Sequence, residues 1–259
     1  MRRFALICCF VLLTVSLAFA QTQPPTKPET KPEPKPATAA LPPVDQITEK
    51  YVQAIGGKAA LEKHNSRRSQ GSFEIAAMGL KGKLTSYEKA PNKTLRVVEI
   101  EGFGSVEQGY DGKTGWARDP MQGLREQSGA ELAMAKIEAE FYQPLKLKEL
   151  YKKLEVKGKD KVGSAEVYVI EATPPEGSPV KMYFDVTSGL LLRVDAEVET
   201  PQGKMPTESL FEDYREVEGV KMPFMLKQNS PAISWVLKLE EVKHNVTIED
   251  AKFAKPSAQ

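Results

Sequence analysis

The sequence has little of the chemistry on which most catalytic and metal sites depend. It contains only two cysteines, Cys8 and Cys9, and two histidines, His64 and His244. Both cysteines lie in an apolar N-terminal run that we expect to be removed, which would leave no disulfide, thiol nucleophile or cysteine metal ligand. The histidines stand far apart without a metal-ligand spacing, so we expect them at the surface. The sequence therefore predicts no metal site and no cofactor.

Two short motifs imitate a serine-enzyme signature, but their context is wrong. Ser86 to Lys89 fits SxxK, and Lys113 to Gly115 fits KTG. The serine of such an enzyme opens a helix, whereas Ser86 lies in a strand pattern, and the two motifs are too close together. A hydrolase of another kind would need clustered polar groups with perturbed pKa values in a cleft, and no sequence feature indicates them. We predict a protein without catalytic residues.

An excess of charge of one sign is also missing. The chain has 36 basic and 35 acidic residues. Removing Arg2 and Arg3 with an N-terminal leader leaves 34 basic residues and a net charge of about −1. This balance gives no general attraction to nucleic acid or to anionic membranes.

Long apolar runs are confined to the N-terminus. Arg2 and Arg3 precede an apolar run over residues 4–17, and Ala18-Phe19-Ala20 offers a small-x-small cleavage pattern before Gln21. A transmembrane anchor is the alternative, but the run is short for one. The pattern predicts a signal peptide over residues 1–20, with cleavage after Ala20 and export of the mature protein.

Residues 21–43 are rich in proline and poor in residues that can be buried. This segment contains eight prolines, among them those of PPTKPETKPEPKP. The composition predicts an extended, disordered tether that acts as a spacer, with a PxxP-type docking site as the alternative.

Alternation with a period of two dominates residues 44–255, where we expect one folded domain. In 180–199 the residues predicted to share one face are Val180, Met182, Phe184 and Val186 before the turn at 187–189, and Leu190, Leu192, Val194, Ala196 and Val198 after it. The segments 220–226 and 233–239 alternate in the same way. Short connections between such strands predict an antiparallel meander.

Two stretches have helical periodicity. Ile47, Tyr51 and Ile55 recur every four residues, with Asp45 as the expected N-cap and Gly56-Gly57 as the end. A short second helix is expected over 58–64. Over 129–142 the apolar stripe consists of Ala130, Ala133, Met134, Ile137 and Phe141. Because the apolar face of a long sheet needs cover, we expect these helical segments to lie on it.

Several short patterns resemble the LolA/LolB-like superfamily of periplasmic lipoprotein carriers. They are YVQAIGG at 51–57, YDGKTGW at 110–116 with Asp119-Pro120, YFD through GLLLR at 183–193, DYR through GVKMP at 213–223, and DAKF at 250–253. The resemblance covers most of residues 44–253 and includes no catalytic signature. It implies an α+β fold in which a strongly curved, half-open antiparallel β-barrel of about 10–11 strands is covered by two helical segments.

The resemblance further implies an apolar cavity between sheet and helical lid. The candidate ligand-binding residues are Trp116, Met134, Ile137, Phe141, Met182, Phe184, Leu190, Leu192, Val194, Met222, Phe224, Trp235 and Leu237. The expected function is a monomeric periplasmic carrier of lipid or lipoprotein acyl chains, with membrane-associated donor and acceptor proteins and a role in outer-membrane biogenesis. The alternative is a non-enzymatic sensor or protein-interaction module on the same fold.

Overall fold

The structure is a computed structural model that describes residues 40–200 and 203–257, without the side chains of 199 and 200. The expected signal peptide and the tether up to residue 39 lie outside the described residues. The first helix begins at Val44, where the folded domain was expected to begin. No helix among the described residues is long and apolar enough to cross a membrane.

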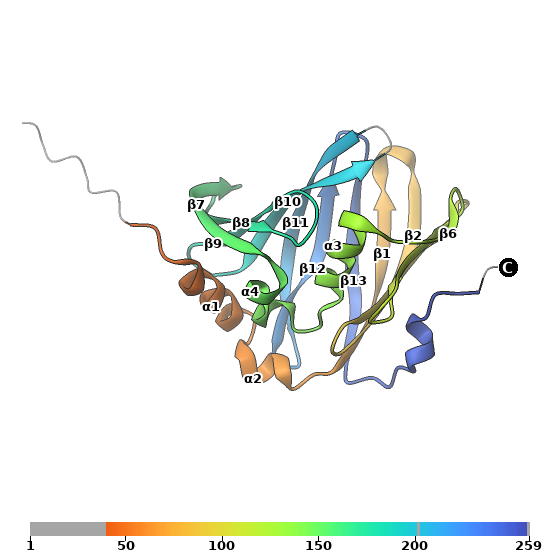
Figure 1. Cartoon of the computed structure of the whole chain (residues 1–259), viewed down its shortest axis with the longest axis horizontal. Coiled ribbons are helices and arrows are strands. Elements are labelled where there is room, and N and C mark those ends of the chain that lie inside the picture. Colours follow the sequence, from red (N-terminus) through yellow and green to blue (C-terminus); the bar gives the residue numbers. More distant parts are fainter. Residues whose placement is uncertain (1–39, 201–202, 258–259) are drawn as a thin grey trace, which may run out of the picture. The chain divides into compact units, whose positions relative to one another are not determined.

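Thirteen strands form one antiparallel sheet (Figure 1). They are β1 Ser66–Ile75, β2 Leu80–Lys89, β3 Lys93–Ile100, β4 Gly104–Tyr110, β5 Gly115–Asp119, β6 Gly123–Glu126, β7 Lys153–Val162, β8 Ala165–Thr173, β9 Val180–Asp185, β10 Leu191–Thr200, β11 Gly203–Val217, β12 Val220–Asn229 and β13 Ser234–His244. The order across the sheet is β6-β5-β4-β3-β2-β1-β13-β12-β11-β10-β9-β8-β7. Two meanders are therefore joined by one long-range pair, β1 with β13, and the sheet is not closed.

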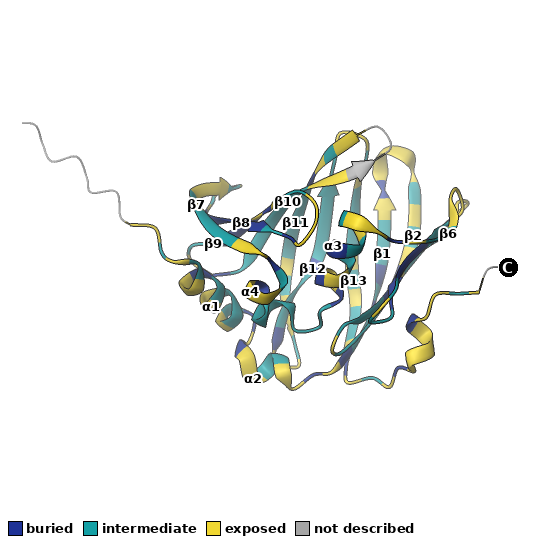
Figure 2. Cartoon of the chain, viewed as in Figure 1, coloured by how far each residue is buried: buried dark blue, intermediate teal, exposed yellow. Residues whose placement is uncertain are grey.

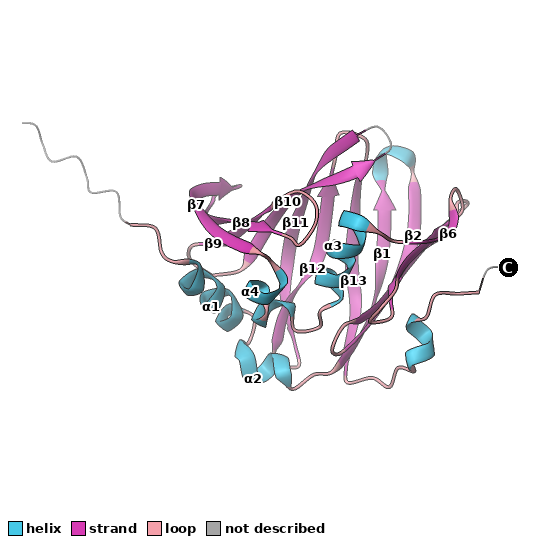
Figure 3. Ribbon diagram, viewed as in Figure 1, coloured by secondary structure: helices cyan, strands magenta, loops and turns pink. Residues whose placement is uncertain are grey.

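The helices are short: two precede the first strand, and two lie in the connection from β6 to β7. They are α1 Val44–Ala54, α2 Gly57–Glu62, α3 Gly129–Ala139 and α4 Leu147–Leu150, with 3-10 turns at Ala76–Met78, Gln143–Leu145 and Asp250–Phe253. Figure 3 shows α1, α3 and α4 on one side of the sheet. The helix expected over residues 129–142 is confirmed, but it ends at Ala139.

The connection from β6 to β7 runs between the two edge strands of the sheet, and α3 lies in it. A Cβ atom built on Gly115 of β5 would lie 2.9 Å from Leu132 Cδ1, and one built on Gly177, in the β8–β9 loop, would lie 3.0 Å from Ala130 Cβ. In a flat sheet β5 and β9 would be about 43 Å apart, at about 4.8 Å per strand. A helix of the length of α3 spans only about 16 Å. The sheet must therefore curve strongly so that both wings reach α3 (Figure 1).

Two details of the expected elements are wrong. Pro43, not Asp45, occupies the N-cap of α1, and no side chain caps this helix. The strand count exceeds 10–11 because the four-residue β6 and the long β11 were not separately predicted. Neither segment shows clear alternation: β11 mixes Thr207, Ser209 and Phe211 on one face.

Candidate functional site

A row of four large apolar side chains crosses the middle of the sheet on its helix-covered face. Phe211 of β11 is opposite Leu226 of β12, Leu226 is opposite Leu237 of β13, and Leu237 is opposite Phe73 of β1. All four are only partly buried, and Figure 2 shows β11 and β12 mainly in the colour of partial burial. Trp235 extends the row, with its ring centroid 5.7 Å from that of Phe73. We call these five residues the apolar floor.

The face of this row follows from the strand registers. Arg67, on the same face of β1 as Phe73, lies over the ring of Phe141 at 5.9 Å, in the segment just after α3. On the other wing, Val194 of β10 is opposite Met182 of β9 and Ser209 of β11. Met182 and Val194 pack with the helices. Ser209 is two residues before Phe211 on β11, so Phe211 shares their face. Alternation thus places the floor on the side of the helices. Four predicted site residues lie on this face of β12 and β13: Met222, Phe224, Trp235 and Leu237.

Helix α3 closes the space between the two wings of the sheet. Its start is held by Arg125, which donates two hydrogen bonds of 2.6 and 2.7 Å to the carboxylate of Glu131. These bonds hold the pKa of Glu131 below its usual value. The absence of a side chain at Gly115 lets α3 pack closely against β5, because a larger residue there would clash with Leu132 and Gln127.

A second group of predicted site residues forms a packed core beside the floor. Ile137 of α3, Met182 and Phe184 of β9 are 2%, 5% and 1% exposed and belong to one cluster with residues of α1 and α4. Met134 and Val194 pack against it. The ring of Tyr51 lies 5.3 Å from that of Phe184, and burial raises the pKa of the Tyr51 hydroxyl to about 12. A ligand would reach this cluster only if α3 moved.

A β-bulge changes the face of one predicted residue. Leu191 is opposite Phe184 but Arg193 is opposite Tyr183, so one extra residue stands between the two pairs. Leu192 therefore packs on the other face, with the cluster of Val167 and Tyr183. The prediction that Leu190, Leu192 and Val194 share a face is wrong, since Leu190 also precedes the strand and lies in the turn.

Trp116 also lies on the face away from the helices. Its side chain is 1% exposed, and its Nε1 donates a 3.0 Å hydrogen bond to the carbonyl of Phe253 in the C-terminal 3-10 turn. Leu95 and Ile248 complete this cluster. Trp116 thus anchors the C-terminal tail to the outer face and does not line the apolar floor.

The two histidines are not surface residues, and that prediction is wrong. His64 and His244 are 2% and 8% exposed, and their rings stack with centroids 4.1 Å apart. Burial, with the nearby His64 and Arg67, lowers the pKa of His244 to about 4. Glu218 completes a group of three metal-binding residue types. No sequence signal could bring these residues together, because only the pairing of β1 with β13 does so.

Two hollows stand out on the described part of the domain. One, of about 400 Å³, is lined by polar residues that include Asn65, Lys89 and Asn245. The other, of about 100 Å³, lies between α1 and β9, next to Ile47 and Phe184. Neither is lined by a residue of the apolar floor, which presents a partly exposed surface.

Comparison with known proteins gives no match by sequence, either to a family model or to a curated protein. Solved structures do match. A DUF1329 family protein from Desulfovibrio piger is 15% identical with a TM-score of 0.58, covering 83% of this chain and 98% of that one. A LolA superfamily protein from Nitrosomonas europaea is 13% identical with a TM-score of 0.55, covering 82% and 97%.

The fold is LolA-like. A third LolA-like neighbour, a domain from Vibrio parahaemolyticus assigned to outer membrane lipoprotein sorting, is 13% identical with a TM-score of 0.53 and covers 81% of this chain and 95% of that one. At these identities the likeness concerns architecture. The resemblance expected from the short sequence patterns is confirmed at that level.

Proposed function

We propose that this domain binds lipid or lipoprotein acyl chains on the apolar floor. The observation that carries the proposal is the in-register row Phe211, Leu226, Leu237 and Phe73, which stays partly exposed on the helix-covered face of a LolA-like sheet. Surface rows of this kind are costly unless they are covered part of the time. The lipoprotein-sorting domain from Vibrio parahaemolyticus supports a lipid ligand.

The energetics favour a long chain over a short one. Each methylene group moved out of water contributes about 0.8 kcal/mol. A chain of about 16 carbons gains on the order of 12 kcal/mol, against an association cost of about 4–15 kcal/mol. Short fatty acids would not offset this cost. Met222, beside the floor, is unbranched and adapts to chains of different shape.

In this proposal α3 is a lid. It covers the floor between the wings through small contacts, Ala130 with Gly177 and Leu132 with Gly115. Both contacts involve glycines and neither is polar. Lifting α3 would also break the Arg125–Glu131 pair and withdraw Ile137 from the packed cluster, so the bound acyl chain has to offset that cost. Lifting α3 would expose the packed cluster of Ile137, Met182 and Phe184 and enlarge the binding surface.

The cellular setting is part of the same proposal. A signal peptide over residues 1–20 would export the chain to the periplasm, and the proline-rich segment 21–43 would act as a spacer. The domain would act as a monomer without catalytic activity. It would receive acyl chains from one membrane-associated partner and deliver them to another, in outer-membrane biogenesis.

The test is native mass spectrometry of the gently purified protein, with organic extraction of what it carries. We expect an added mass that extracts as lipid. Leu237→Glu should abolish this mass, whereas Lys238→Glu, the next residue on the opposite face, should keep it. A protein that carries no lipid and takes up neither phospholipid nor an acylated peptide would contradict the proposal. Sensor or protein-interaction roles would then be the better account of the fold.

A further inference from the structure

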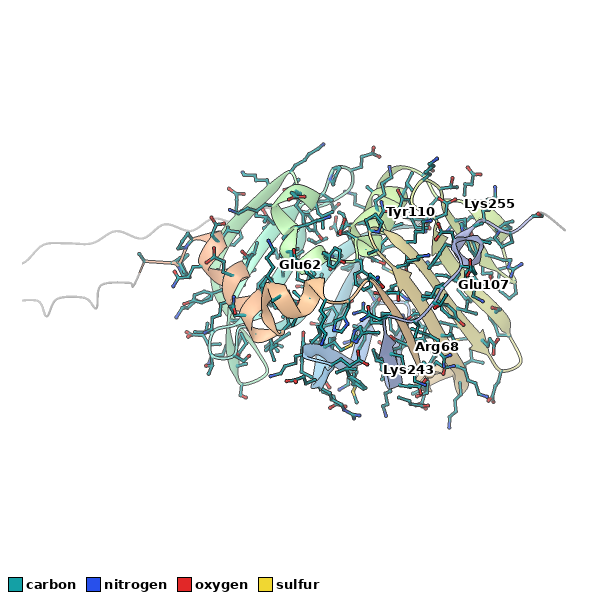
Figure 4. The ribbon with its side chains drawn as sticks, turned by 90° about the horizontal axis from the view of Figure 1, so that it is seen from below. Glu62, Arg68, Glu107, Tyr110, Lys243 and Lys255 are labelled. Atoms are coloured by element: carbon teal, nitrogen blue, oxygen red, sulfur yellow. The ribbon has the colours of Figure 1, made fainter. Side chains whose placement is uncertain are left out.

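Three side chains from distant parts of the sequence meet at one end of the sheet. His64 follows α2 and precedes β1, Glu218 lies in the turn between β11 and β12, and His244 ends β13. The pairing of Arg67 with His244 brings the first and last of these segments together. Figure 4 views the domain from this end and labels Glu62 in α2 and Lys243 in β13, close in sequence to the two histidines.

The local backbone directs Glu218 toward the histidines. Glu218 and Gly219 have φ angles of 51° and 87°, and such left-handed pairs make the tight turns that join antiparallel strands. Glu218 Oε2 lies 4.0 Å from His64 Nδ1 and 3.7 Å from His244 Nδ1. One ligand atom from each of the three residues falls within 4.8 Å of the others.

Hydrogen bonds fix which nitrogen of His64 carries no proton. The backbone N–H of Asn65 donates to Asn245 Oδ1 at 3.0 Å, so the amide nitrogen of Asn245 faces His64. This nitrogen donates to His64 Nδ1 at 3.2 Å, which leaves the ring proton on Nε2, where it donates to the carbonyl of Glu218 at 3.1 Å. A histidine that gives its other ring N–H to a backbone carbonyl is typical of metal ligands.

His244 supplies an independent observation. Its side chain is 2% exposed, and its Nδ1 is buried without a hydrogen-bond partner while it lies near the Glu218 carboxylate. Leaving a buried polar atom unpaired is costly, and each such atom in a folded protein needs an explanation. Here the unpaired nitrogen faces a carboxylate and the unprotonated nitrogen of a second imidazole.

We propose that His64, His244 and Glu218 form a binding site for one zinc ion, with the fourth position left for water. Two imidazoles and a carboxylate are a donor set that zinc takes in proteins. Ligand atoms around a tetrahedral zinc lie about 3.4 Å apart, given bonds of about 2.0–2.1 Å, so the ligand atoms need to close by less than about 1.5 Å. The two stacked imidazoles, whose planes differ by 23°, also need to turn so that both ring nitrogens point at the ion. The Asn245 amide is the contact that the ion would displace. The side chain of Glu218 is 54% exposed, which gives the ion a path from solvent.

This site lies apart from the apolar floor and does not depend on the lipid proposal. Arg67, the nearest positive group on β1, is paired with Glu88 on β2 and is thereby compensated. An ion held here would tie the start of β1, the end of β13 and the β11–β12 turn together. Its role would be to fasten the two meanders where they meet.

The experiment uses chelator-treated protein, zinc alone, and a competing chromophoric chelator that reports affinity. In parallel, NMR of the imidazole rings follows the two histidines, which are the only two in the chain. We expect one zinc per chain to shift the signals of both rings. Zinc held by Cys8 or Cys9 would leave both rings unchanged, so the ring signals decide.

Variants give the matched comparison. Glu218→Gln keeps the size of an exposed side chain and should weaken zinc binding by at least about tenfold. Glu216→Gln, exposed on the same hairpin but outside the cluster, should bind as the unchanged protein does. His244→Asn should abolish zinc binding. If the His244→Asn variant does not fold, the comparison of Glu218→Gln with Glu216→Gln still tests the site. Unshifted ring signals at one equivalent of zinc, or equal affinities in the Glu218 and Glu216 variants, would overturn the proposal.

Discussion

Two glycines on neighbouring strands allow a direct test of how the two faces of the sheet are packed. Gly109 of β4 is opposite Trp116 of β5, and the next pair along is Tyr110 with Gly115. Gly109 faces the outer cluster and Gly115 faces the lid helix α3. A methyl group added at either position meets atoms closer than normal contact, but the atoms differ in kind.

At Gly109 the added methyl group would lie 2.3–2.5 Å from three atoms of the Trp116 indole. This ring is rigid, 1% exposed and hydrogen bonded to Phe253. It would have to move by about 1 Å, which adds an overpacking cost of about 1–3 kcal/mol to the loss of a hydrogen bond worth about 1 kcal/mol. Replacing Gly by Ala within a strand by itself stabilises the fold by about 0.5–1 kcal/mol, which offsets part of this cost. We expect Gly109→Ala to lower the free energy of unfolding by about 2–3 kcal/mol.

At Gly115 the same methyl group would lie 2.5 Å from Gln127 Oε1 and 2.9 Å from Leu132 Cδ1. Both are ends of flexible side chains that can turn away, so we expect Gly115→Ala to cost less than about 1 kcal/mol. Urea unfolding followed by circular dichroism measures both values. A Gly115→Ala cost equal to or above that of Gly109→Ala would show that the outer cluster is not the rigid face and would refute this reasoning.

Three further predictions concern the tail and the bulge. Phe253→Ala should cost about 3–5 kcal/mol of unfolding free energy in urea titration, because the side chain is fully buried against Trp116. Hydrogen bonds from Lys89 and Lys93 lower the pKa of Asp250 to about 2. Since this folded-state pKa is below that of the unfolded chain, the contribution is present above about pH 4 and is lost as pH falls toward 2. Asp250→Asn should therefore flatten the acid limb of the stability–pH curve, and an unchanged limb would contradict the pairing. Leu192→Glu should leave lipid retention in the mass-spectrometric assay unchanged, because Leu192 is on the outer face; loss of lipid in a folded variant would count against the bulge.

Much of the fold could be predicted because alternation reports burial directly. The hairpin predicted from 73–75 and 80–87, the strands within 155–173, and the strands 180–186, 220–226 and 233–239 all fall within strands of the structure or overlap them closely. Alternation fails at Leu192 because a β-bulge inserts one extra residue there. The alternation counted back from Val194 therefore assigns Leu192 to the wrong face of the sheet. β6 has only four residues and β11 mixes polar and apolar side chains on one face, so neither strand was separately predicted.

The candidate site was predictable only in part. Trp235 and Leu237 belong to a strand with a clear pattern. The other members of the row, Phe73 on β1 and Phe211 on β11, join it only through strand registers that a single sequence does not display. The length of a strand does not say which residue stands opposite which. The two histidines were placed at the surface because their spacing shows no motif, whereas it is the closing pair of strands that buries them.

The pairing of β1 with β13 has a consequence for how the chain acquires its structure. One edge of β1 stays unpaired until β13 forms, and β13 (residues 234–244) is almost the last element of the domain. Contacts of such long sequence separation form slowly, because much chain must be ordered before they are made. Until then β1 and its polar backbone groups offer an open edge to other chains. A chain truncated before β13 is therefore expected to aggregate and not to remain a partly folded monomer. A chaperone would be most effective if it covered the open edge of β1.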